Sequence, residues 1–432
     1  MLKIKNVSAF QIYDSRGVPT LETEVELENG VMGRGLVPSG ASTGQYEALE
    51  MRDGDKARFR GKSVFRAIAH VQGEIASAVR GMDATDQRAI DQSLIKLDGT
   101  PNKSRLGANA ILSVSMAVAN AAAAGHHQAL FEYLGGGEGT LLPLPEIQIL
   151  GGGAHAEWRT DVQDFLVIAV GAKNYGETLE MTHNVYHAAG AILSERGRRF
   201  GIADEGGFWP DFSTNEEAIK TLVLAIERAG YTPGKDVAIS LDIAASDLYN
   251  EKDGKYRFKL EKREFTSQEF ADLVIAWCRR YPIISVEDPV ADTDWDGWAR
   301  VYAAVGKSVQ LIGDDLFTTN AERIQRGIDA KIANAVLIKL NQIGTVTETM
   351  DAIRMTQNAG WLPVVSARSG ETEDAFISHL AVATNAGQLK VGSFARSERM
   401  VKWNEVLRIE RRLGRRARFE GGKIYKRVLS ES

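Results

Sequence analysis

The hydrophobic and polar positions change their period twice along the chain. Residues 21–30 (LETEVELENG) alternate apolar and charged side chains and end in Asn29-Gly30, a pair typical of hairpin turns. From about residue 55 to 133 the apolar positions recur with helical spacing, as in residues 67–82 (AIAHVQGEIASAVRGM). This pattern predicts an antiparallel sheet followed by helices, an α+β unit with its own core.

Beyond residue 137 the pattern changes to apolar runs without polar alternation, separated mostly by helical segments. Such strands are buried on both faces, as in parallel sheets. Eight runs over some 250 residues predict an α/β fold with a (β/α)₈ barrel, and a doubly wound open sheet is the alternative. A glycine-rich connection at residues 134–139 (LGGGEG) divides the chain into predicted domains 1–136 and 137–432. The runs are LPEIQIL, DFLVIAV, VAISLD, PIISVED, VQLIGDD, AVLIKLN, LPVVSA and LKVGSF.

Three successive runs end in carboxylates, at Asp242, at Glu287-Asp288 and at Asp314-Asp315. The carboxyl ends of barrel strands converge on one face, so these side chains are expected to lie together. Mg²⁺ prefers oxygen ligands and usually binds a few carboxylates beside water. A metal site is therefore favoured over the alternative, that these acidic residues only cap helices.

Two later runs carry lysines, Lys339 within AVLIKLN and Lys390 within LKVGSF. A lysine among apolar strand residues is costly unless it is paired or functional, although a lysine at a strand edge can also point outward. Burial and neighbouring cations lower a lysine pKa and make the amine a competent base. Beside the three carboxylates, the lysines indicate proton removal next to a metal-bound carboxylate.

Short loops rich in glycine add polar groups that suit a phosphate or an oxyanion. They contain Ser39 (SGASTG), His155 (GGGAH), Glu205 (DEGG) and the pair Arg368-Ser369 (SARSGE). Each loop alone is also compatible with an ordinary turn. The remaining histidines lie in helical contexts and are interpreted as structural.

Composition excludes several classes of protein. The net charge of −5 provides no basic field for a nucleic acid polymer, and the single cysteine, Cys278, excludes a disulfide framework or a thiolate zinc site. The first residues carry charges and lack an apolar signal core, and no apolar run is judged long enough to span a membrane. A cytoplasmic protein without a membrane partner is expected.

Long segments of the chain resemble the enolase (phosphopyruvate hydratase) family. The resemblance implies a small N-terminal α+β domain, a modified barrel, a homodimer or a higher homo-oligomer, and two Mg²⁺ ions per site that bind a small phosphorylated carboxylate. The matching segments include DSRGVPTLETEV, VPSGASTGQYEALEMRDGD, GGGAHAEWRTDVQDF, LDIAASDLY, VEDPVADTDWDGW, GDDLFTTN, SARSGETED and FARSERMVKWNEVLRIE.

The resemblance also implies a role for each matching residue. Lys339 matches the base that removes the α proton, Lys390 the lysine that binds the substrate carboxylate, and Glu205 the acid that assists departure of the hydroxyl. The predicted Mg²⁺ ligands are Asp242, Glu287 and Asp314, with Ser39 tied to a second ion. The predicted substrate contacts are Ser39, His155, Arg368, Ser369 and Lys390, and Asp164 is a further catalytic acid.

Four positions depart from the family pattern. Ala367 replaces the histidine of Ser-His-Arg-Ser-Gly-Glu, Asp164 replaces the glutamate of Gln-Glu-Phe, Val18 replaces asparagine, and Trp209 replaces alanine. The metal ligands and both lysines are intact. Enolate formation is therefore expected to be kept while the leaving-group chemistry is altered.

The specific function expected on this basis is that of a carboxyphosphonoenolpyruvate synthase in phosphonate biosynthesis, a transferase-like reaction with a second anionic or nucleotide-activated phosphonate substrate. Ordinary enolase activity and a non-catalytic scaffold are the alternatives. The basic segment 411–418 (RRLGRRAR) is interpreted as a solvated helix, with attraction of a second anion as the alternative.

Overall fold

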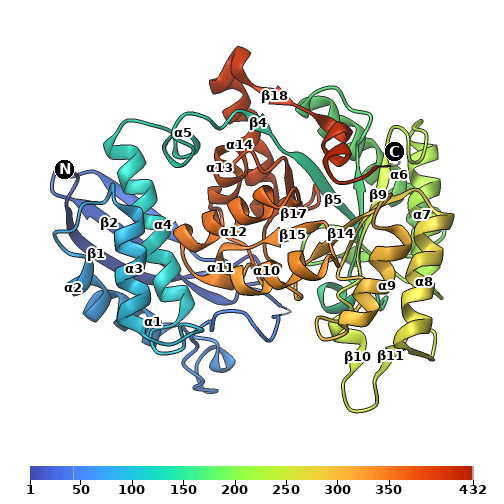
Figure 1. Cartoon of the computed structure of the whole chain (residues 1–432), viewed down its shortest axis with the longest axis horizontal. Helices are drawn as coiled ribbons and strands as arrows, with labels where there is room; N and C mark the ends of the chain where they lie inside the picture. Colours follow the sequence, from blue (N-terminus) through green and yellow to red (C-terminus); the bar gives the residue numbers. More distant parts are fainter. Residues whose placement is uncertain (42, 431–432) are drawn as a thin grey trace.

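The N-terminal part forms the expected sheet followed by helices. The computed structural model describes residues 1–41 and 43–430 (Figure 1). Strands β1 (Ile4–Tyr13), β2 (Pro19–Leu27) and β3 (Met32–Leu36) form an antiparallel meander in that order. The β2–β3 turn contains Gly30 at a φ of 83°, as the Asn-Gly pair predicts. The helices are α1 (Phe65–His70), a π-helix (Val71–Ile75), α2 (Ala76–Val79), α3 (Gln87–Asp98), α4 (Ala108–Gly125) and α5 (Leu130–Leu134).

Helix α4 is the core helix of this unit. It is 18 residues long with a mean hydropathy of 1.3, which is enough by length and composition to cross a membrane. The expectation that no apolar run reaches that length is therefore wrong. However, 83% of the helix is buried inside the structure, where it packs on β2 and β3. Such burial is typical of a core helix in a folded domain.

Eight strands of the second part close into a barrel, which confirms the barrel and excludes the open sheet. Pairing runs from β5 through β6, β9, β13, β14, β15 and β16 to β17, and β17 pairs back with β5. The barrel strands are β5 (Leu144–Gly151), β6 (Asp164–Ile168), β9 (Ala238–Asp242), β13 (Ile283–Glu287), β14 (Gln310–Gly313), β15 (Ala335–Ile338), β16 (Leu362–Ser366) and β17 (Gln388–Gly392).

One barrel strand departs from the predicted all-parallel arrangement. Strand β6 is antiparallel to both β5 and β9. Parallel pairing needs a crossover connection, usually a helix, and residues 152–163 between β5 and β6 contain only one short 3₁₀ turn. The short link therefore turns β6 back along β5.

Helices surround the barrel, and short strands lie at its periphery. The helices are α6 (Tyr175–Glu195), α7 (Asn215–Arg228), α8 (Ser267–Arg280), α9 (Trp295–Val305), α10 (Ala321–Ala330), α11 (Leu340–Ile343), α12 (Val346–Asn358), α13 (Phe376–Ala383) and α14 (Ser397–Leu413). The peripheral strands are β4 (Leu141–Leu142), β7 (Arg199–Ile202), β8 (Phe208–Pro210), β10 (Tyr249–Asn250), β11 (Lys255–Phe258), β12 (Arg263–Thr266) and β18 (Arg418–Phe419).

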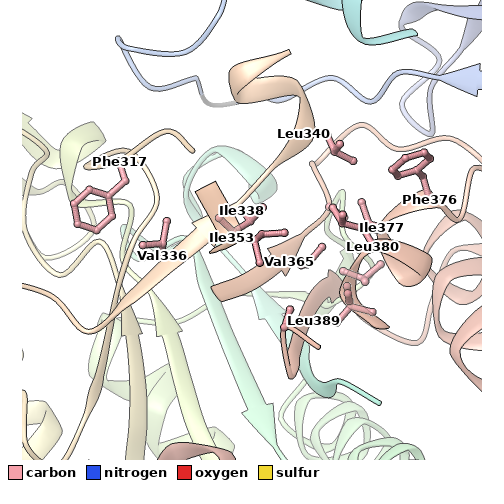
Figure 2. Packing of buried hydrophobic residues seen from close by; sticks show 14 of the residues in the cluster. Phe317, Val336, Ile338, Leu340, Ile353, Val365, Phe376, Ile377, Leu380 and Leu389 are labelled. Carbon is pink, nitrogen blue, oxygen red and sulfur yellow. The ribbon is translucent and has the colours of Figure 1, made fainter. Parts of the chain in front are cut away.

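Alternate positions of the barrel strands face opposite sides of the sheet. Figure 2 shows Val365 and Leu389 beside Ile353 of α12 and Leu380 of α13, and Val336 lies toward Phe317. These positions therefore belong to the apolar layer between the strands and the helices. The positions between them face the barrel interior, which is partly filled by a second apolar cluster that includes Tyr425 near the C-terminus. This alternation directs Lys339 and Lys390 inward.

Candidate active site

The three predicted metal carboxylates and both lysines meet at the carboxyl ends of the strands. Nζ of Lys390 lies 2.7 Å from Oδ2 of Asp242 and 2.7 Å from Oε2 of Glu287, and Lys339 pairs with Asp314. All five side chains are buried or nearly so. Asp242 and Glu287 are register partners on β9 and β13, which explains why one ammonium group bridges them.

These contacts decide the charges of the buried groups. Burial alone would raise the pKa of Asp242, but Lys390 outweighs it and lowers the pKa to about 2. Burial would lower the pKa of Lys390, yet Asp242 and Glu287 hold it well above its usual value. The pKa of Lys339 is also raised, because Asp314 outweighs burial. The expectation of a depressed lysine pKa is therefore not met, because it left out the carboxylate partners of the two lysines.

The residues present suit a divalent cation. Each of the three predicted ligands forms an ion pair with a lysine ammonium group. Positive charge therefore lies at the positions where a metal ion is expected. Oε1 of Glu287 is buried without a hydrogen-bond partner among the described residues. Oxygens of Asp288, Asp314 and Asp315 also lie within 4.8 Å of one another. Asp288, however, accepts the backbone N–H groups of Asp314 and Asp315, so it shapes the turn after β14.

A second group of titratable residues lies at the β5–β6 side of the mouth. Nδ1 of His155 is 3.1 Å from Oδ1 of Asp164, and Glu205 belongs to the same cluster. Burial disfavours a charged imidazole, but Asp164 and Glu205 outweigh burial and raise the pKa of His155 to about 9. Burial raises the pKa of Glu205, which favours its protonated form.

The predicted phosphate contacts lie where the N-terminal loop meets the barrel. The Arg368 guanidinium donates to Glu47 at 2.9 and 3.2 Å and to Asn341 at 3.0 Å. Ser369 accepts hydrogen bonds from the backbone N–H of Ala41 and from Arg16. A carboxylate thus already lies against Arg368, at the place where an anionic substrate group is expected.

Ser39 is only partly placed as predicted. Its backbone forms a two-way bridge with Gly370, next to the phosphate contacts. Its hydroxyl, however, donates to Glu50 and accepts from Arg52, and the structure does not bring it to the metal carboxylates. Ser42 of the same loop lies outside the described residues.

Most of the predicted residues line one narrow cavity. The predicted residues that line it are His155, Glu205, Asp242, Asp314, Lys339, Arg368, Ser369 and Lys390. Ala367 lines it as well, so the position of the missing family histidine opens into the site.

Sequence reasoning missed several polar residues around these groups. Gln342 donates to Asp314 at 2.7 Å, Gln163 donates to Asp242 at 3.2 Å, and Gln148 donates to Asp164. Glu47, the partner of Arg368, was also missed. Isolated amides and loop carboxylates have no distinctive spacing, although the inward alternation of β5 would have found Gln148.

Comparison with known proteins identifies the family. Residues 4–134 match the model of the enolase N-terminal domain, and residues 139–428 match that of the enolase C-terminal TIM barrel domain. The chain is 55% identical over 424 residues to Enolase 1 of Desulfitobacterium hafniense (strain Y51), covering 98% of this chain and 97% of that protein. The chain belongs to the enolase family. The division between residues 136 and 137 stays a prediction.

The specific function expected from the sequence departures is wrong. Full-length identity of 55% to a protein named an enolase supports a lyase and gives no support to a carboxyphosphonoenolpyruvate synthase, a transferase or a second phosphonate substrate. The same identity favours an enzyme over a scaffold. The four departures from the family pattern therefore do not indicate a different reaction in a chain this similar to an enolase.

Proposed function

We propose that the protein is an enolase that converts 2-phosphoglycerate to phosphoenolpyruvate and water. The observation that carries this proposal is the cavity that Lys339, Glu205 and the carboxylates Asp242 and Asp314 line together. A base, an acid and an anion-stabilising cation site are the three parts that removal of water next to a carboxylate requires.

Each group of residues has its own role in the proposed reaction. Asp242, Glu287 and Asp314 would hold Mg²⁺, whose charge stabilises the doubly negative carboxylate that forms when the α proton leaves. Lys339 accepts that proton in its uncharged form. Because Asp314 raises the pKa of Lys339, engagement of Asp314 as a ligand favours the uncharged amine. Glu205 donates a proton to the departing hydroxyl, and the carbon–carbon double bond forms as water leaves.

Substrate binding uses the cationic groups around the same cavity. In this proposal Lys390 binds the substrate carboxylate. Arg368 and Ser369 bind the phosphate, which displaces Glu47 from Arg368. The neighbouring Asp164 raises the pKa of His155, which favours its protonated form and adds positive charge beside Glu205. Assembly as a homodimer and a cytoplasmic location, which the resemblance and composition suggest, are part of this proposal and are checked by light scattering and fractionation.

The test is to add 2-phosphoglycerate and Mg²⁺ and to monitor the formation of phosphoenolpyruvate by its absorbance. Substituting Lys339→Ala should lower the rate by about 10²- to 10⁴-fold and abolish exchange of the α proton with deuterated solvent. Lys307→Ala, which removes an exposed lysine, should leave both unchanged. Absence of turnover in the Mg²⁺-loaded native protein, or α-proton exchange that persists in Lys339→Ala, would contradict the proposal.

A further inference from the structure

A buried carboxylic acid, Glu146, lies on the strand next to Lys390 and has no role in the steps described above. Glu146 is in the middle of β5, is 1% exposed, and is the register partner of Lys390 on the neighbouring strand β17. Neighbouring strands lie about 4.8 Å apart, and register partners in parallel strands point to the same side of the sheet. Both residues therefore face the barrel interior, with Gln148 and Leu144 two positions away on either side.

The surroundings of Glu146 satisfy only one of its oxygens. Oε2 accepts a hydrogen bond from Ser240 at 3.1 Å, while Oε1 is buried and has no hydrogen-bond partner among the described residues. Burial raises the pKa of Glu146 to about 7, although Lys390 acts to lower it. A carboxyl group buried with a free oxygen is costly in a barrel interior that branched apolar side chains usually fill.

The present partners of Lys390 are the residues that a divalent cation needs. Its ammonium group bridges Asp242 and Glu287, and both are proposed Mg²⁺ ligands. When these carboxylates turn to a metal, Lys390 stays buried and charged but loses its closest anions. A buried ion left without a partner is strongly unfavourable, so the metal has to compete with the lysine.

We propose that Glu146 is a positioning residue that receives the ammonium group of Lys390 when Asp242 and Glu287 bind a divalent cation. The four-carbon stem of Lys390 lets its ammonium group move between the mouth carboxylates and the free oxygen of Glu146. This second partner lowers the energy needed to free the two ligands, and it keeps Lys390 charged. The inference rests on the proposed metal site and adds a residue to it.

The first experiment measures Mg²⁺ affinity by calorimetry without substrate. Glu146→Gln keeps the shape of the side chain and a hydrogen bond with Ser240 but removes the charge. We expect Mg²⁺ to bind about 10- to 100-fold more weakly, as when partners behind a metal ligand are removed. Gln310→Met, which removes another buried polar side chain of the barrel, is the matched control and should bind as the native protein does. Unchanged affinity in Glu146→Gln overturns the proposal.

A double-mutant cycle separates this role from a general effect of negative charge. If Glu146 acts through Lys390, then Glu146→Gln should have no further effect on Mg²⁺ affinity in a Lys390→Met background. An equal loss in both backgrounds overturns the proposal, because a nearby charge would act on the metal regardless of the lysine. Failure of the native protein to bind Mg²⁺ would instead contradict the proposed function.

Discussion

At the scale of single residues, the charge of His155 depends on the carboxylates that surround it. Asp164 and Glu205 raise its pKa from 6.5 to about 9, against the effect of burial. Because the pKa is higher in the folded state, protonation of His155 stabilises the fold fully below about pH 6.5. That stabilisation is lost as the pH rises through about 9.

Replacing Asp164 by asparagine tests this dependence. The substitution removes the nearest carboxylate, so the pKa of His155 should fall toward its ordinary value, as followed by NMR of the imidazole ring. The signal of His126, on the N-terminal domain, is the internal control. A native midpoint near 6.5, or a midpoint that Asp164→Asn leaves in place, would show that Asp164 does not set the charge of His155.

At the scale of elements, the sheet and α4 of the N-terminal domain lie unusually close. A Cβ atom at Gly35 would collide with the backbone of α4 at Ser113 and Ala117, and Gly33 is equally restricted by Ala117 and Ala121. The backbones of β3 and α4 could make room for an added Cβ atom only if the core helix shifted away from the sheet. Glycine is therefore required here by close approach and not by an unusual φ angle.

Gly35→Ala should accordingly destabilise the domain by about 1–3 kcal/mol, the usual effect of forcing extra atoms into a packed core. The free energy of unfolding in urea measures it. Gly73→Ala is the matched control, since Gly73 lies in a helical segment where an added Cβ meets nothing within 4 Å. An unchanged free energy in Gly35→Ala would mean that α4 shifts freely against the sheet.

The elements also show what sequence patterns can and cannot predict. The apolar runs located all eight barrel strands, and the polar residues at their ends located Asp242, Glu287, Asp314 and Lys339. The direction of β6 was missed because it depends on the length of a connection, not on the strand itself. Glu146 and Gln148 were missed because an apolar run hides inward polar positions unless its alternation is followed residue by residue. Glu47 was missed because it reaches Arg368 only through the tertiary fold.

At the scale of the whole molecule, the site joins the two parts of the chain. Loop residues before α1 contact the barrel through the Ser39–Gly370 bridge and the Glu47–Arg368 ion pair. Of the proposed Mg²⁺ ligands, Asp242 lies on β9, Glu287 lies on β13, and Asp314 lies on the turn after β14. A cation bound there links distant segments that only the folded chain brings together.

Mg²⁺ should therefore stabilise the folded protein by mass action. At a free concentration 100 times the dissociation constant, one bound ion adds about 2.7 kcal/mol to the free energy of unfolding. Thermal unfolding with Mg²⁺ and then with excess chelator measures the gain and its reversal. Asp314→Asn should remove most of the response, whereas Asp351→Asn, which breaks an exposed ion pair with Arg88, should keep it. An equal Mg²⁺ response in native protein and Asp314→Asn would place the ion elsewhere on the molecule, because a ligand that contributes to binding cannot be lost without weakening the stabilisation.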